Sequence, residues 1–133
     1  MNTLLDKACQ QLESPAPQSL RRACWLARAA LEDLIDDLLR TKGITADRAS
    51  ERAKLSCLEG AYPEDRALAH KAQYAWNRLS DACHQHAYQL SPTYVEVRHL
   101  MGLVEELASP AQTAARSRGE RRDDRARGSA VRD

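Results

Sequence analysis

Residues 70–90, HKAQYAWNRLSDACHQHAYQL, decide the fold, because their spacing predicts one long helix with two chemically different faces. Small and apolar side chains recur at about 100° per residue and form a face that we expect to contact a core. They are Leu68, Ala72, Ala75, Leu79, Ala82, His86 and Leu90. The opposite face, here called the polar stripe, consists of His70, Tyr74, Asn77, Asp81, His84 and Tyr88, flanked by Arg78 and Gln85. A merely solvated face favours Lys and Glu, so this composition indicates recognition or proton transfer.

Two helices are predicted ahead of this stretch. A short amphipathic helix spans residues 2–13, and the Ser-Pro-Ala-Pro spacer at residues 14–17 ends it. A longer helix spans residues 19–42, with Ser19 as its capping residue and Gly43 as its stop.

The 19–42 helix carries apolar side chains beyond a single stripe. The stripe itself consists of Leu20, Cys24, Ala27, Leu31, Leu34 and Leu38. Trp25 and Leu39 lie off it. A helix that is apolar on more than one face is predicted either to occupy the centre of a bundle or to meet a second subunit.

A third helix is predicted over residues 46–59, with Thr45 as its cap and Gly60 as its stop. Its thin apolar side consists of Ala49, Ala53, Cys57 and Leu58. The sequence YPED at residues 62–65 then starts the long helix, because Pro suits a first helical turn and acids favour the N-terminal end of the helix dipole. That helix is predicted to close near Leu90.

A fifth helix is predicted with Ser91 as its cap and Pro92 as its first residue. Its apolar positions are Tyr94, Val97, Met101, Val104 and Ala108. Strand signals are absent. The sequence therefore predicts an all-α, single helical bundle of four to five helices over residues 19–109. An N-terminal helix and Pro-containing spacer (1–18) precede it, and an Arg-rich tail (110–133) with almost no large apolar residue follows and is predicted to be disordered.

Charge and cysteine usage narrow the function classes. The 133-residue chain has a net charge of +1, but residues 110–133 hold seven Arg against four acids, so the remainder is slightly acidic. The part of the chain before residue 110 therefore lacks the excess of positive charge that is typical of a nucleic-acid-binding domain. Four cysteines without a CxxC pair predict buried free thiols. They are Cys9, Cys24, Cys57 and Cys83. With no apolar run of membrane-spanning length and no secretory signal, we expect a cytoplasmic protein that does not enter a membrane.

Two histidines near the end of the long helix raise the question of a metal site. On a continuous helix, side chains two positions apart point about 200° away from each other, so His84 and His86 cannot share an ion unless the helix ends between them. We therefore predict no metal and no cofactor. His86, on the core face, is predicted to be a hydrogen-bonded core residue. The chain also lacks a Walker loop, a GxSxG or HExxH motif and a dinucleotide fingerprint.

Arg78 and His84 are six positions apart, with Asp81 one turn from each. One interpretation is a surface salt bridge beside a polar residue. The other is catalytic: an Arg that holds a phosphate and a His that moves a proton are the groups needed to cleave RNA without a metal. Candidate binding residues on the same polar stripe are Tyr74, Asn77 and Tyr88.

Two segments carry a resemblance to a known family: ARAALEDLIDDLLR (27–40) and AWNRLSDACHQHAYQLSPTYVEVRHLMGLVEEL (75–107). The chain resembles the HEPN superfamily (higher eukaryotes and prokaryotes nucleotide-binding), in particular small actinobacterial members with an ACHxHAYxLxPT segment. The resemblance covers about residues 19–108. It implies a helical bundle that is often a homodimer. In catalytic members, an Arg followed four to six residues later by a His faces its copy across the dimer and cuts RNA without a metal.

Arg78 and His84 match that spacing. Catalytic members usually place a polar residue directly after the Arg, where this chain has Leu79. Asp81 could replace that residue only by acting from one turn further along. Two function classes follow, with a purely structural helical adaptor as a third alternative. As an enzyme, the protein would be a metal-independent endoribonuclease of the defence or toxin type, with an antitoxin as its protein partner. As a non-catalytic module, it would bind a nucleotide, RNA or protein. The sequence leaves open whether it is an enzyme.

Overall fold

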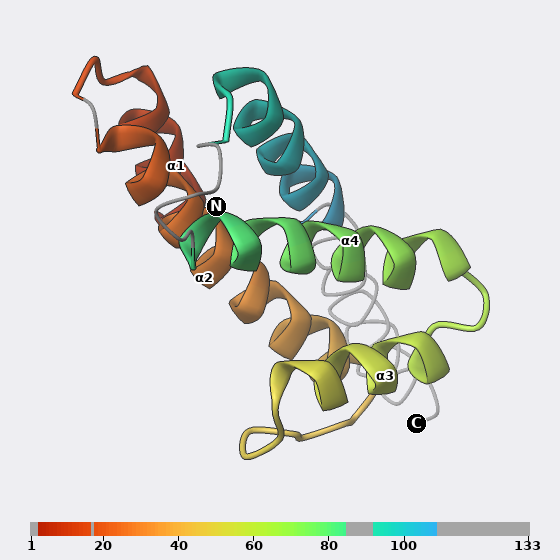
Figure 1. Ribbon diagram of the computed structural model, residues 1–133. Coiled ribbons are helices and arrows are strands. Elements are labelled where there is room, and N and C mark those ends of the chain that lie inside the picture. Colours follow the sequence, from red (N-terminus) through yellow and green to blue (C-terminus); the bar gives the residue numbers. More distant parts are fainter. Residues whose placement is uncertain (1–2, 17, 85–91, 109–133) are drawn as a thin grey trace, which may run out of the picture.

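The computed structural model describes residues 3–16, 18–84 and 92–108, and all regular secondary structure in this part of the chain is helical. The helices are α1 (Thr3–Glu13), α2 (Ser19–Thr41), α3 (Glu51–Ala61) and α4 (Arg66–Cys83), followed by a C-terminal helix over residues 94–108. α1 and α2 form an antiparallel pair, and α4 crosses α2 (Figure 1). The predicted all-α bundle is confirmed for the described residues.

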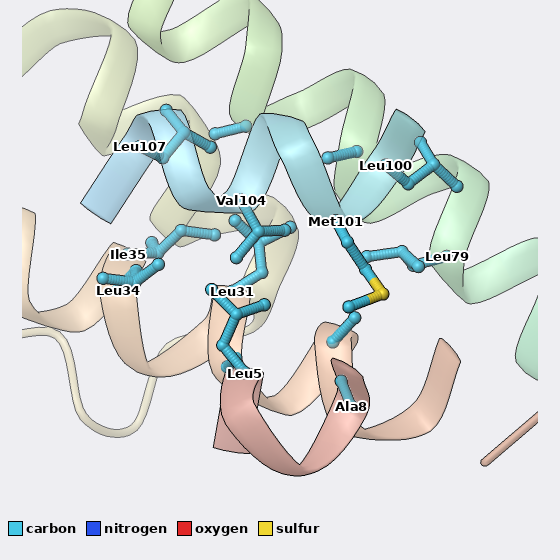
Figure 2. Packing of buried hydrophobic residues seen from close by; sticks show 14 of the residues in the cluster. Leu5, Ala8, Leu31, Leu34, Ile35, Leu79, Leu100, Met101, Val104 and Leu107 are labelled. Atoms are coloured by element: carbon cyan, nitrogen blue, oxygen red, sulfur yellow. The ribbon is translucent and has the colours of Figure 1, made fainter. Parts of the chain in front are cut away.

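One hydrophobic core joins all of these helices, and α2 lies at its centre because it packs against α1, α3 and α4. Side chains of the C-terminal helix point toward α1 and α2 on one side and toward α4 on the other (Figure 2). The core extends into α1, where Leu5, Ala8 and Leu12 are buried. None of the helices in the described ranges has the length and apolar character of a membrane span.

The central position of α2 explains its wide apolar surface. Leu39, which lies off the predicted stripe, is 1% exposed, whereas Trp25 is 49% exposed. Gly43 ends the helix as predicted, with a φ of 77° that L-residues rarely adopt. The predicted cap is wrong: Gln18 is the N-cap, and the Ser19 hydroxyl is buried without a hydrogen-bond partner in the structure.

The prediction for the third helix was wrong at both ends. α3 begins at Glu51 and not at residue 46, because the Ser50 side chain accepts a hydrogen bond from the Ala53 backbone N–H. It continues through Gly60 to Ala61. Its buried face also differs, since Lys54, Leu55 and Leu58 are buried while Ala53 and Cys57 are exposed.

The prediction that α4 extends to Leu90 was also wrong. Asp65 caps the helix by accepting from the Leu68 N–H, and the expected apolar positions from Leu68 to Leu79 are buried. The helix nevertheless ends at Cys83, whose carbonyl accepts a hydrogen bond from Arg21 Nη2 of α2 at 3.3 Å. The remaining predictions for this segment lie outside the described residues. They concern Gln85, His86, Tyr88 and Leu90.

The C-terminal helix begins later than predicted, because Thr93 caps it by accepting from the Glu96 N–H at 3.2 Å. Pro92 precedes the helix. The buried positions of this helix are Val97, Leu100, Met101, Val104 and Leu107. Tyr94, predicted to share the apolar side, is 51% exposed. The predicted tail at residues 110–133 lies outside the described residues.

Candidate functional site

The described part of the polar stripe lies on the solvent side of α4. His70, Tyr74, Asn77 and Asp81 are exposed, as is the flanking Arg78. Asn77 also lines an open groove of about 340 Å³ between α3 and α4. The other residues of this groove are Arg52, Leu55, Ser56, Glu59 and Gln73. The stripe is therefore accessible.

The structure does not bring the three predicted catalytic side chains together. Among the described residues, no ion pair or hydrogen bond joins Asp81 to Arg78 or to His84. For His84 the reason is the early end of α4: it is the C-cap of the helix, with φ −103° and ψ 35°, so its side chain leaves the helical register.

His84 instead reaches across to α2. Its Nε2 lies 3.2 Å from Arg28 Nη1, and its ring meets Trp25 edge-on at a centroid distance of 6.1 Å. An arginine side chain has only donors, so in this contact Nε2 is the acceptor. The side chain that contacts His84 is thus that of Arg28, not that of Arg78.

Arg28 is the centre of a group of five side chains that we call the Arg28 cluster: Trp25, Arg28 and Glu32 of α2, Trp76 of α4, and His84. The spacing of three and four residues puts the α2 members on one face of that helix. The guanidinium carbon lies 6.0 Å from the Trp25 ring centroid and 5.4 Å from that of Trp76. Both distances are within cation–π range.

One carboxylate oxygen holds two members of the Arg28 cluster. Glu32 Oε1 accepts from Arg28 Nε at 3.2 Å and from the Trp76 indole N–H at 3.4 Å. The Arg28 side chain is 19% exposed and that of Glu32 34%. A fully exposed ion pair contributes little, but this one is partly shielded by indole rings and links α2 to α4.

The thiols near the Arg28 cluster are not candidate nucleophiles. Burial is the main cause that raises the pKa of Cys24 to about 12, with Cys83 adding to the effect. Burial also raises the pKa of Cys83, against the opposing charge of Arg28. Both thiols are therefore protonated at neutral pH. The prediction of buried free thiols holds for these two, whereas Cys9 is partly buried and Cys57 is exposed.

The charges of α2 divide sharply along its length. Residues 19–31 contain three arginines and no acid, while residues 32–37 contain four acids. Cations near a helix N-terminus oppose the helix dipole, so the basic half is not explained by helix stability. Because the half-exposed Trp25 lies within this half, α2 offers an aromatic surface bordered by positive charge.

Helical periodicity did not single out Arg28, Glu32 or Trp76 as functional residues. Two local signals were available: Arg28 and Glu32 are spaced four apart, and Trp25 lies off the apolar stripe. The contact between Arg28 and Trp76 joins two helices, and no periodicity within one helix reports it.

No family model, curated protein or solved structure matches this chain. The resemblance to the HEPN superfamily therefore stays a prediction. The C-terminal end of α4 meets α2 (Figure 1). The chemistry available there is a shielded guanidinium, an exposed indole and an imidazole that points its acceptor nitrogen at that guanidinium.

Proposed function

We propose that this chain is a non-catalytic RNA-binding helical module that stacks an unpaired base on Trp25 and holds the neighbouring phosphates with arginines of α2. The observation that carries the proposal is the 49% exposed indole of Trp25 beside the Arg28 guanidinium and the His84 ring. Base–aromatic stacking contributes about 1–3 kcal/mol per base and tolerates every base. Arginine adds a planar donor set that suits phosphate oxygens.

Single-stranded RNA suits this surface better than a duplex, because only unpaired bases expose a face for stacking. The basic half of α2 supplies Arg21, Arg22 and Arg28. Three phosphate contacts on a single strand correspond to a salt dependence of log affinity with a slope of about −2. A slope near zero would exclude phosphate binding by this surface.

The geometry favours binding over cleavage. A general base needs a free lone pair, and the Nε2 lone pair of His84 is directed at an Arg28 donor. The guanidinium that would stabilise a transition state is in turn paired with Glu32. Among the described residues, no hydrogen bond joins Arg78 to His84, which instead contacts Arg28. Each of these features suits a preorganised recognition surface.

The second candidate function is the metal-independent endoribonuclease of the defence or toxin type. Its support is that an exposed histidine, His84, lies within 3.2 Å of a guanidinium, although that guanidinium belongs to Arg28. In this proposal the protein acts as a cytoplasmic homodimer with an antitoxin partner. Cleavage of labelled RNA in EDTA, lost in both Arg78→Ala and His84→Ala, would support it. Light scattering measures whether the protein is a dimer.

The test of the binding proposal is fluorescence anisotropy with a short labelled single-stranded RNA at low salt. Trp25→Ala should weaken binding by about tenfold or more, as expected for loss of one stacked base. Tyr74→Ala is the matched control, because Tyr74 is also 49% exposed but lies outside the Arg28 cluster. Equal effects of the two substitutions, or no binding by the wild-type protein, would overturn the proposal.

A further inference from the structure

We infer that Glu32 is the positioning residue of the RNA-binding surface, an inference that rests on the proposed function. Its Oε1 atom is the shared acceptor for Arg28 Nε at 3.2 Å and for the Trp76 indole N–H at 3.4 Å. Glu32 thereby fixes the side of the guanidinium that faces away from His84. The opposite side, at Nη1, contacts His84 Nε2.

The hydrogen bonds of Glu32 determine where the Arg28 guanidinium lies relative to the two indole rings of the cluster. With the Nε side held by Glu32, the guanidinium carbon lies over the Trp25 and Trp76 rings, at 6.0 and 5.4 Å from their centroids. Without Glu32, Arg28 could rotate to solvent and the Trp76 N–H would lose its protein acceptor. A preorganised side chain binds more tightly because less of its conformational freedom is lost on binding.

The electrostatic effect of Glu32 has the opposite sign, which makes the inference testable. A carboxylate beside a phosphate-binding guanidinium repels the phosphate, so its removal should tighten binding if charge alone matters. If position matters more, its removal should weaken binding despite the loss of a negative charge.

Three variants separate these effects. Glu32→Ala should weaken RNA binding by about tenfold, whereas Glu32→Gln, whose amide oxygen can still accept from both donors, should stay within about threefold of the wild type. Asp33→Ala is the control, since it removes an exposed acid at the adjacent position of α2, and it should bind at least as tightly as the wild type. Tighter binding by Glu32→Ala would overturn the inference.

A second measurement uses the free protein. The NMR resonance of the Trp76 indole N–H should move in Glu32→Ala and keep nearly its wild-type position in Glu32→Gln, while that of Trp25 moves less. An unmoved Trp76 resonance in a folded Glu32→Ala protein, checked by thermal melting, would refute the contact. If the wild type binds no RNA, the proposed function and this inference both fall. If it binds RNA and Glu32→Ala binds equally well, only the inference falls.

Discussion

Asp36 of α2 forms an ion pair with the buried Lys54 of α3. Substitution of Asp36 therefore tests the packing of α2 against α3. The Lys54 ammonium lies 2.8 Å from Asp36 Oδ1 and 3.5 Å from Glu51 Oε1, and the Lys54 side chain is only 8% exposed. The hydrogen bond that Lys54 donates to Asp36 raises the pKa of Lys54, although burial acts in the opposite direction. Asp36→Ala would leave this cation buried with one longer contact.

The expected magnitude follows from the exposure of the pair. Removing one partner of a fully buried pair costs about 3–5 kcal/mol. Asp36 is 24% exposed and Glu51 remains, so we expect Asp36→Ala to lower the free energy of unfolding by about 2 kcal/mol. The control is Asp37→Ala, which breaks a pair with Arg40 whose side chains are 56% and 59% exposed, and which should cost less than about 1 kcal/mol.

Urea unfolding of the two variants at neutral pH measures the difference. The comparison is balanced, because both substitutions relieve repulsion of Asp33, whose pKa is raised by burial and by the charges of Asp37 and Asp36. Adding Lys54→Met to Asp36→Ala should recover part of the loss, since it removes the buried cation but also takes away the partner of Glu51. If Asp36→Ala costs no more than Asp37→Ala, the ion pair between Asp36 and Lys54 does not stabilise the packing of α2 against α3.

The burial of the thiols and the backbone angles of the glycines lead to further predictions about cysteine reactivity and stability. In the native protein Cys57 should react with iodoacetamide while Cys24 stays protected, and equal rates by mass spectrometry would contradict the packing. Because the folded pKa of Cys24 is raised from 9.0 to about 12, the unfolded thiol ionises first. The contribution of the buried, protonated Cys24 thiol to the free energy of unfolding is therefore present below pH 9 and lost as the pH rises toward 12. Cys24→Ala should remove a slope of at most about 1.4 kcal/mol per pH unit from alkaline denaturation curves. Gly43→Ala should cost about 1 kcal/mol because of its positive φ, whereas Gly60→Ala, inside α3 with open space at its Cβ, should stabilise by about 0.5–1 kcal/mol in thermal melts.

The fold could be predicted because its determinants are local. The apolar positions of α4 from Leu68 to Leu79 recur at helical spacing, and each is buried where the period places it. Gly43 marks its helix end by conformational preference alone. Helix boundaries were harder wherever two capping candidates competed: Thr45 and Ser50 are both suitable caps, but only Ser50 accepts from the backbone of α3. A helix that starts after Ser50 has Lys54 in its first turn, where it pairs with Asp36 of α2.

The site depends on a tertiary contact that no helical period contains. Continued helix would have kept His84 on the polar stripe with Arg78, as the sequence predicted. Instead the Cys83 carbonyl accepts from Arg21, a residue 62 positions earlier, and α4 ends there. With the helix ended, the His84 ring meets Arg28 and Trp25 of α2. The hydrogen bond from Arg21 of α2 thus marks the end of α4. Just beyond it, His84 contacts the guanidinium of Arg28 on another helix and not that of Arg78. Arg21→Ala should therefore loosen His84 from Trp25, which the ring resonances of both residues would report, and unchanged resonances would show that the helix end is set locally.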